Sequence, residues 1–188
     1  MEQVEKQRRR NRIISLAAVA LIAVVAVTVV AYSLTARGNA VPLPRYLDRC
    51  VTGTTLIYHA HPSLSIVINQ TGFTIPARVG IQGACNKPIH THDTSGTLHV
   101  ETDEDRDYKL SDFFLIWGNW ANNAQLAIFN STQIFGSHVV GSHTLTMTVN
   151  NTPDTSFQNY VIPRTSSTPA DTCSSSPCTP VSIVITYS

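Results

Sequence analysis

Closely spaced histidines are the residues of this chain that could do chemistry. Five of the seven histidines fall into three short groups: His59 with His61, His90 with His92, and His99 two residues before Glu101. In an extended chain, side chains two positions apart point to the same side of the strand. Each group can therefore direct two ligand atoms at one point, which is the geometry that a metal site requires.

The same alternation separates these histidines from the apolar side chains. Leu98 and Val100 share one face of a predicted strand, whereas His99 takes the other face. Counted back from Leu64, the first histidine pair also falls on the face opposite to the apolar residues. This pattern disfavours imidazoles that merely fill a core. We assign structural roles to the two other histidines, His138 and His143.

The residue types indicate which ions such a site would take. Neutral imidazole is a ligand for zinc, copper, nickel and iron. The sequence therefore predicts a transition-metal site, with copper and zinc as the leading ions and five ligands: His59, His61, His90, His92 and His99. Asp93 and Glu101 are candidates to bind the ion, to orient a ligand imidazole, or to act as a general base. The alternative is a hydrogen-bond network, or a pH-responsive cluster, without metal.

Three classes of function follow from this cluster. The favoured hypothesis is a binding domain that holds a transition metal for storage, sensing, delivery or support of a membrane complex. The second is a structural or interaction subunit of a cell-envelope assembly, in which the histidines only form hydrogen bonds. A metal-dependent hydrolase with Glu101 or Asp93 as base is less favoured, because the sequence contains no nucleophile elbow and no phosphate-binding loop. No catalytic residue is assigned.

The N-terminal segment predicts where this domain is placed. Residues 13–34 form a run of 22 residues without a charged side chain, and a helix of that length reaches about 33 Å, enough to cross a bilayer core. Residues 1–12 carry five basic residues against two acidic ones, which predicts a cytoplasmic tail. We therefore expect a single-pass anchor in the lipid bilayer of the cell membrane, a juxtamembrane linker over 35–49 and an extracytoplasmic domain over 50–188. The alternative is a cleaved signal peptide that ends near 38–40.

Charge excludes one class of partner. The formal net charge of the chain is +1, but the part after residue 36 has eight basic and ten acidic residues. A nucleic-acid groove needs a positive field on the folded part of a protein. The sequence therefore predicts no nucleic-acid partner and leaves membrane-complex or envelope proteins as expected partners. The acidic run at 103–107 is interpreted as solvated surface, with a site for a hard cation as the alternative.

The four cysteines are consistent with an oxidising compartment. Cys173 and Cys178 enclose only four residues, so a local disulfide between them is favoured. Cys50 would then pair with Cys85 by elimination. This is one of the three connectivities that four cysteines allow. The alternative is a free Cys85 that binds the metal as a thiolate.

The remaining pattern is that of a β-rich domain. Alternating or β-branched runs predict strands at 54–58, 64–68, 73–81, 97–101, 145–149, 159–162 and 181–187. Residues 110–118 predict one short helix with Ser111 as its N-cap and Gly118 at its end, and with an apolar stripe that faces the core. The fold class is therefore α+β and β-dominated: a transmembrane helix followed by a small, mainly antiparallel, β-grasp-like or sandwich-like domain.

Four segments carry a resemblance to a known group of proteins. They lie between Tyr58 and Gly118 and read YHAHPSLSIVIN, FTIPARVGI, CNKPIHTHDTSGTLHVE and YKLSDFFLIWG. This third of the chain resembles a family of uncharacterised, single-pass, membrane-anchored prokaryotic ectodomains, in which an HTHDxSGxxHxE block is the most specific part. Ser111 departs from the small residue that the family has before the helix aspartate. The resemblance implies extracytoplasmic placement and joint use of the five clustered histidines, and it implies no particular activity.

Overall fold

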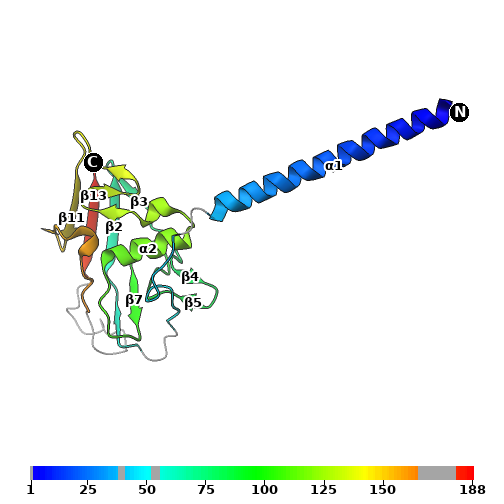
Figure 1. Ribbon diagram of the computed structural model, residues 1–188. Helices are drawn as coiled ribbons and strands as arrows, with labels where there is room; N and C mark the ends of the chain where they lie inside the picture. The colour runs from blue at the N-terminus through cyan, green and yellow to red at the C-terminus, as the bar shows by residue number, and fades with distance from the viewer. Residues whose placement is uncertain (1, 38–40, 52–55, 165–180) are drawn as a thin grey trace. The chain divides into compact units, whose positions relative to one another are not determined.

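The structure is a computed structural model that describes residues 2–37, 41–51, 56–164 and 181–188. The chain divides into two compact units, Met1–Asn39 and Ala40–Ser188. The first unit contains the helix α1 (Glu2–Arg37), and the second is a β-rich domain with one further α-helix among its described residues (Figure 1). The prediction of a small, β-dominated domain is confirmed.

The N-terminal helix corrects the expectation of a transmembrane anchor. Within the part of the chain that the structure describes, no helix is long and apolar enough to cross a membrane. The prediction that residues 13–34 span a bilayer is therefore wrong. The prediction relied on the absence of charged side chains from this segment.

A five-stranded sheet forms one part of the domain. Its strands are β2 (Ser63–Ile68), β3 (Thr71–Phe73), β11 (Leu145–Val149), β12 (Thr152–Pro153) and β13 (Ser182–Tyr187), in the order β12-β11-β13-β2-β3 (Figure 1). The strands β13 and β2 are parallel, and the other neighbours are antiparallel. Alternate residues of β13 are buried, namely Ile183, Ile185 and Tyr187. The strand predicted over 181–187 is therefore present, and its alternate side chains face the core.

A three-stranded antiparallel sheet, called here the histidine sheet, carries the clustered histidines. It consists of β1 (Tyr58–Ala60), β6 (Ile89–His90) and β7 (His99–Thr102), with β7 in the middle. The register pairs His59 with Glu101 and His90 with His99. Directly paired residues point to the same face of a sheet, so three separate segments place these side chains together. The opposite face is buried and includes Ala60, Ile89 and Val100.

Short elements complete the fold. The remaining strands are β4 (Ile81–Gln82), β5 (Cys85–Asn86), β8 (Phe129–Asn130), β9 (Gln133–Ile134) and β10 (Ser137–His138). The strand β4 pairs with β5, and β9 lies between β8 and β10. Two 3₁₀ helices, η1 (Ala124–Ala127) and η2 (Phe157–Asn159), both contact the helix α2 (Leu110–Trp120).

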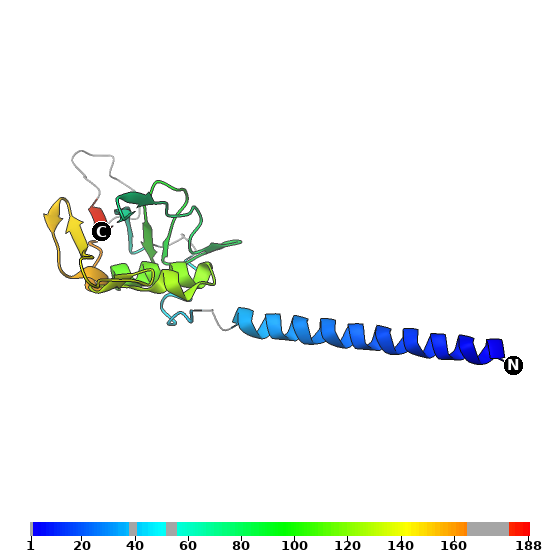
Figure 2. The same ribbon diagram turned by 90° about the horizontal axis from the view of Figure 1, so that it is seen from above.

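The α2 helix supplies much of the hydrophobic core. Phe113 and Trp117 are among the largest fully buried side chains, as their helical spacing predicts. Figures 1 and 2 show this helix alongside the strands, on one side of the domain. Its first turn is closed by Asp112, whose Oδ2 accepts a hydrogen bond from the Lys109 backbone N–H at 2.8 Å. The predicted cap residue, Ser111, is the second residue of the helix.

The helix α2 also continues past its predicted end. Gly118 lies inside the helix, which ends at Trp120. A Cβ at Gly118 would lie 2.6 Å from the Ala127 Cβ and 2.8 Å from the Ala127 backbone nitrogen, well inside van der Waals contact. Glycine is therefore required here by the close approach of η1 to α2, and not by a helix C-terminus.

Two predicted strands are replaced by other structure. The strand expected over 73–81 is reduced to the end of β3 and the start of β4, and the chain turns between them, with Arg78 at φ +65° and Gly80 at φ +74°. A left-handed backbone cannot continue a pleated strand. Residues 159–162 form the end of η2 and one isolated bridge. Of the strand predicted over 54–58, residues 54 and 55 lie outside the described residues.

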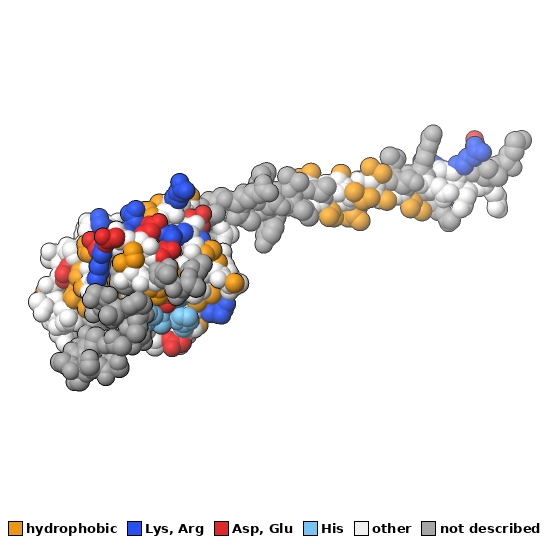
Figure 3. Space-filling view, turned by 90° about the horizontal axis from the view of Figure 1, so that it is seen from below, with side chains coloured by type: hydrophobic (Ala, Val, Ile, Leu, Met, Phe, Trp, Pro, Cys, Tyr) orange, Lys and Arg blue, Asp and Glu red, His pale blue; other side chains and the backbone are white. Residues whose placement is uncertain are grey.

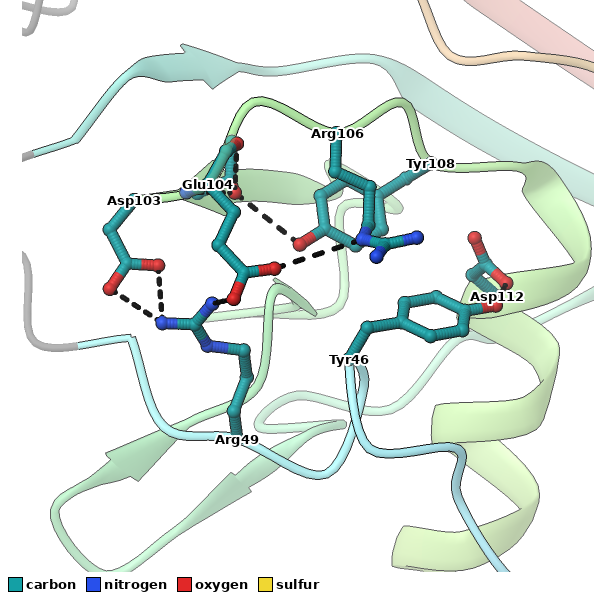
Figure 4. A network of polar contacts seen from close by, with 8 residues as sticks. Tyr46, Arg49, Asp103, Glu104, Arg106, Tyr108 and Asp112 are labelled. Carbon is teal, nitrogen blue, oxygen red and sulfur yellow. Dashed lines mark hydrogen bonds and ion pairs between the residues drawn. The ribbon is translucent and has the colours of Figure 1, made fainter.

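Ion pairs fasten the acidic loop that follows β7. Arg49 pairs with Asp103 at 2.7 Å and with Glu104 (Figure 4). The Tyr46 hydroxyl donates a hydrogen bond of 2.9 Å to Asp112 Oδ1, and burial together with this bond raises the pKa of Tyr46 to about 12. The loop is therefore more than solvated surface. Its ion pairs connect Arg49, which precedes Cys50, to the residues that directly follow β7, the central strand of the histidine sheet.

Candidate metal centre

Five histidines and one glutamate meet on one face of the histidine sheet. They come from β1 and the residue after it (His59, His61), from β6 and the segment after it (His90, His92), and from the central strand β7 (His99, Glu101). Histidine side chains reach the surface together at one place (Figure 3). The predicted clustering of the five histidines is confirmed, and these side chains could hold a metal ion.

One set of ligand atoms, the β1 set, lies between β1 and β7. His61 Nε2 is 3.0 Å and His59 Nε2 is 3.5 Å from His99 Nδ1. All three side chains are partly buried, and one ligand atom from each lies within 4.8 Å of the others. Two nitrogens bound to one tetrahedral zinc, at about 2.0–2.1 Å each, lie about 3.3 Å apart. The spacing of the β1 set is therefore that of ligands to a common ion.

A second set of ligand atoms, the β6 set, lies between β6 and β7. His90, His92, His99 and Glu101 each offer one ligand atom, and these four atoms lie within 4.8 Å of one another. His90 is buried, His99 and Glu101 are partly buried, and His92 is exposed. The set therefore extends from the protein interior to the solvent, so that an ion could enter it without unfolding of the domain.

The Glu101 carboxylate, a member of the β6 set, also lies close to His59 of the β1 set. Its Oε1 is 3.2 Å from His59 Nε2 and 3.9 Å from His90 Nε2. At these distances the carboxylate is placed both to bind an ion and to accept a hydrogen bond from a ligand imidazole. Both roles were expected for Glu101 from its spacing to His99.

The His90 side chain presents a ligand atom that no described protein group satisfies. The side chain is 0% exposed, and its Nδ1 lies 2.9 Å from the Lys87 carbonyl oxygen. Because a carbonyl only accepts hydrogen bonds, Nδ1 carries the proton and Nε2 carries the lone pair. Nε2 is buried and has no hydrogen-bond partner among the described residues. Metal-binding histidines are oriented in this way, with the other ring nitrogen donating to a carbonyl.

Burial keeps the imidazoles of His90 and His99 uncharged, which is the form that can bind a metal ion. The pKa of His99 is lowered to about 3, mainly because burial disfavours the charged ring and also because neighbouring histidines repel a positive charge. Burial likewise lowers the pKa of His90, against the opposing effects of the Lys87 carbonyl and the Glu101 charge. Near neutral pH both rings therefore keep a lone pair for a ligand.

A disulfide anchors the segment that leads to His90. Cys50 is bonded to Cys85, so this predicted pairing is confirmed and Cys85 is not a free thiolate ligand. Lys87, whose carbonyl orients the His90 ring, follows Cys85 by two residues. The disulfide therefore restrains the chain close to the carbonyl that fixes the ring. The other predicted pair lies outside the described residues: Cys173 and Cys178.

Three polar residues considered from the sequence lie apart from both sets. Asp93 is exposed, and its Oδ1 accepts a hydrogen bond of 2.9 Å from the Ser95 backbone N–H. Neither the β1 set nor the β6 set includes Asp93. His143 stacks on the ring of Tyr187, with centroids 5.3 Å apart, and His138 is exposed on β10. Both histidines are exposed, and neither belongs to the β1 set or to the β6 set.

The backbone carbonyl of Lys87, which orients the His90 ring, could not be predicted from the spacing of side chains. The Lys87 carbonyl that orients His90 is placed by a turn in which the Lys87 backbone N–H donates to the Gly80 carbonyl oxygen at 2.9 Å. A Cβ at Gly80 would lie 2.8 Å from the Ile89 carbonyl oxygen and 3.3 Å from the His90 Cβ. In the sequence, only the glycine between Val79 and Ile81 hints at this close packing.

Comparisons with known proteins add no family to this description. No protein family, curated protein or solved structure matches the chain. The function of the site is therefore argued from its geometry, which consists of two overlapping sets of nitrogen and oxygen atoms that could hold a metal ion.

Proposed function

We propose that this domain binds a transition-metal ion, zinc or copper, through the histidine cluster, and that it stores, senses or delivers that ion. The proposal is carried by the buried Nε2 of His90, which has no hydrogen-bond partner among the described residues. A buried polar atom without a partner costs about 1–3 kcal/mol. A metal ion bound to this lone pair removes that cost.

A hydrogen-bond network without metal accounts for only part of the cluster. It explains the contact of 3.0 Å between His61 and His99 and the contact of 3.2 Å between His59 and Glu101. It leaves His90 Nε2 without a proton donor, since an ionised carboxylate only accepts hydrogen bonds and lies 3.9 Å away. One bound ion satisfies this nitrogen as well, and the metal-binding role is therefore the better supported one.

The ligand types favour zinc or copper over harder ions. The cluster offers five imidazoles and a single carboxylate. Imidazole suits zinc and copper, whereas magnesium and calcium prefer sites built from oxygen. Cys85 is held in a disulfide, so the cluster lacks the thiolate that a site for copper in its reduced state would favour.

The disulfide supports a place of action outside a reducing cytosol. Disulfides such as Cys50–Cys85 persist in oxidising compartments. The exposed His92 gives an ion in the surrounding solution direct access to the β6 set. Both features suit an extracytoplasmic domain that takes up a metal ion or passes it to a partner protein of the cell envelope.

Metal binding by the purified full chain tests this proposal. After incubation with Zn²⁺ or Cu²⁺ and dialysis, the chain should retain bound metal in elemental analysis, and its melting temperature should rise with metal concentration. A chain that stays metal-free and melts at the same temperature with either ion would contradict the proposal.

The substitution His90→Ala tests the observation that carries it. Loss of the buried ligand should weaken zinc affinity by about 100-fold, at least as much as loss of a residue that only orients a ligand. The matched control is His143→Ala, which removes a histidine outside both ligand sets. This control should keep the zinc affinity of the unaltered chain, and equal losses in the two variants would point to unspecific binding.

A further inference from the structure

We propose that the cluster holds two metal ions, one in the β1 set and one in the β6 set, with the His99 imidazole as a ligand to both. This inference rests on the proposed metal-binding function and goes beyond it. Its basis is that His99 belongs to both sets of ligand atoms. An imidazole has two ring nitrogens that point away from each other, so one ring can serve two ions.

The nitrogen of His99 that faces the β1 set is identified by distance. Nδ1 lies 3.0 Å from His61 Nε2 and 3.5 Å from His59 Nε2. These values bracket the separation of about 3.3 Å between two nitrogens on one tetrahedral zinc. The His59 and His61 nitrogens therefore each lie at a distance from His99 Nδ1 that suits two ligands of one ion. Three such ligands would leave a fourth position for solvent.

The remaining donors form the β6 set, which shares His99 with the β1 set. The rings of His61 and His92 are each steeply inclined to the His99 ring, at 74° and 84°, with centroids 4.3 Å from it in both cases. His90, whose buried Nε2 has no hydrogen-bond partner among the described residues, belongs to the β6 set and not to the β1 set. An ion bound only by the β1 set would leave this nitrogen unsatisfied, so the β6 set needs an ion of its own.

One four-coordinate ion cannot use all the donors that the cluster provides. Five imidazoles and one carboxylate exceed the four ligands that zinc usually takes. Two ions that share His99 use every one of them, with two unshared imidazoles in each set and Glu101 in the β6 set. When the second ion binds, the remaining N–H proton of His99 passes to solvent, and the ring becomes a bridging imidazolate with one negative charge.

The number of ions per chain tests the inference. The full chain, titrated with Zn²⁺ and dialysed, should retain two zinc ions. His61→Ala, which alters only the β1 set, and His92→Ala, which alters only the β6 set, should each retain one. The control His143→Ala should retain two. One zinc per unaltered chain would overturn the inference while the proposed function stands, and no bound zinc would overturn both.

Copper provides a second readout that depends on the shared ring. Two Cu²⁺ ions joined by one imidazolate couple antiferromagnetically, so the copper-loaded chain should give a low-temperature electron paramagnetic resonance signal well below two spins. His92→Ala, with one copper left, should give the full signal of one spin. Two copper ions that give the full signal of two independent spins would exclude His99 as the bridge.

Discussion

The two nitrogens of His90 are used differently, and this difference carries the metal hypothesis. Nδ1 is fixed at 2.9 Å from the Lys87 carbonyl oxygen, whereas Nε2 is buried with no partner among the described residues. An imidazole that only filled space would leave this polar atom as a permanent cost of about 1–3 kcal/mol. The ring is therefore oriented so that a metal ion could bind Nε2, which no described residue satisfies.

At the same scale, the buried imidazoles predict how the stability of the metal-free chain depends on pH. The pKa of His99 is about 3 in the folded protein and about 6.5 in an unfolded chain. Between these values the unfolded chain binds more protons than the folded one, so the free energy of unfolding decreases as the pH falls below about 6.5. The lowered pKa of His90 acts in the same direction.

Urea denaturation of the chelator-treated chain at about pH 7.5 and about pH 5.5 measures this effect. The unaltered chain should be less stable at the lower pH, and His99→Gln should reduce the difference. His143→Gln serves as the control and should behave as the unaltered chain does. An equal loss of stability in all three chains would show that the effect arises elsewhere.

At the scale of elements, the period of two predicted some strands well and failed at others. Residues 145–149 were predicted as a strand from alternation and 181–187 as a further strand, and β11 and β13 occupy nearly the same positions. These strands each bury one face, so the sequence repeats with the pleat. The strand predicted over 73–81 is broken by left-handed residues, including Arg78 at φ +65°. Arginine does not indicate such a conformation, because the surrounding packing imposes it.

The sequence predicted more of the candidate site than of the strands that carry it. Histidines two residues apart on a strand share a face whatever the strand order, so the five clustered imidazoles were expected together. The full burial of His90 could not be predicted, because it depends on packing contributed by segments remote in sequence. The sharing of His99 by the two sets could not be predicted either, because it depends on the strand register that pairs His90 with His99.

Gly80, directly before β4, packs closely against β6, so a methyl group added there should affect both the stability of the domain and the site. Gly80→Ala would place a Cβ 2.8 Å from the Ile89 carbonyl oxygen and 2.9 Å from Ile116 Cγ2. We expect a loss of about 1–3 kcal/mol in the free energy of unfolding from overpacking, and weaker zinc binding because β6 must shift. Chemical denaturation and zinc titration measure the two effects.

Gly83→Ala is the matched control for that substitution. Gly83 also has a positive φ, +60°, but a Cβ there would meet no atom within 4 Å. Both variants therefore carry the strain of a left-handed alanine, and only Gly80→Ala adds a clash with the strand of the site. Equal zinc affinities in the two variants would show that the position of β6 does not control the site.

At the scale of the whole molecule, the domain brings distant segments of the chain to one face that could hold a metal ion. The histidine sheet joins residues 58–60, 89–90 and 99–102, and β2 pairs in parallel with β13 near the end of the chain. The β-rich character of this unit was predicted from composition and alternation. The membrane-spanning segment was predicted wrongly, because a run without charge was taken as a run apolar enough to cross a bilayer.

Anomalous X-ray scattering from crystals of the full chain grown with zinc tests the central claim most directly. The proposed site predicts an anomalous peak about 2.0–2.1 Å from His90 Nε2, within the cluster on the histidine sheet. Absence of a peak at this nitrogen in crystals that contain zinc elsewhere, or a water molecule bound there in its place, would contradict metal binding at the site.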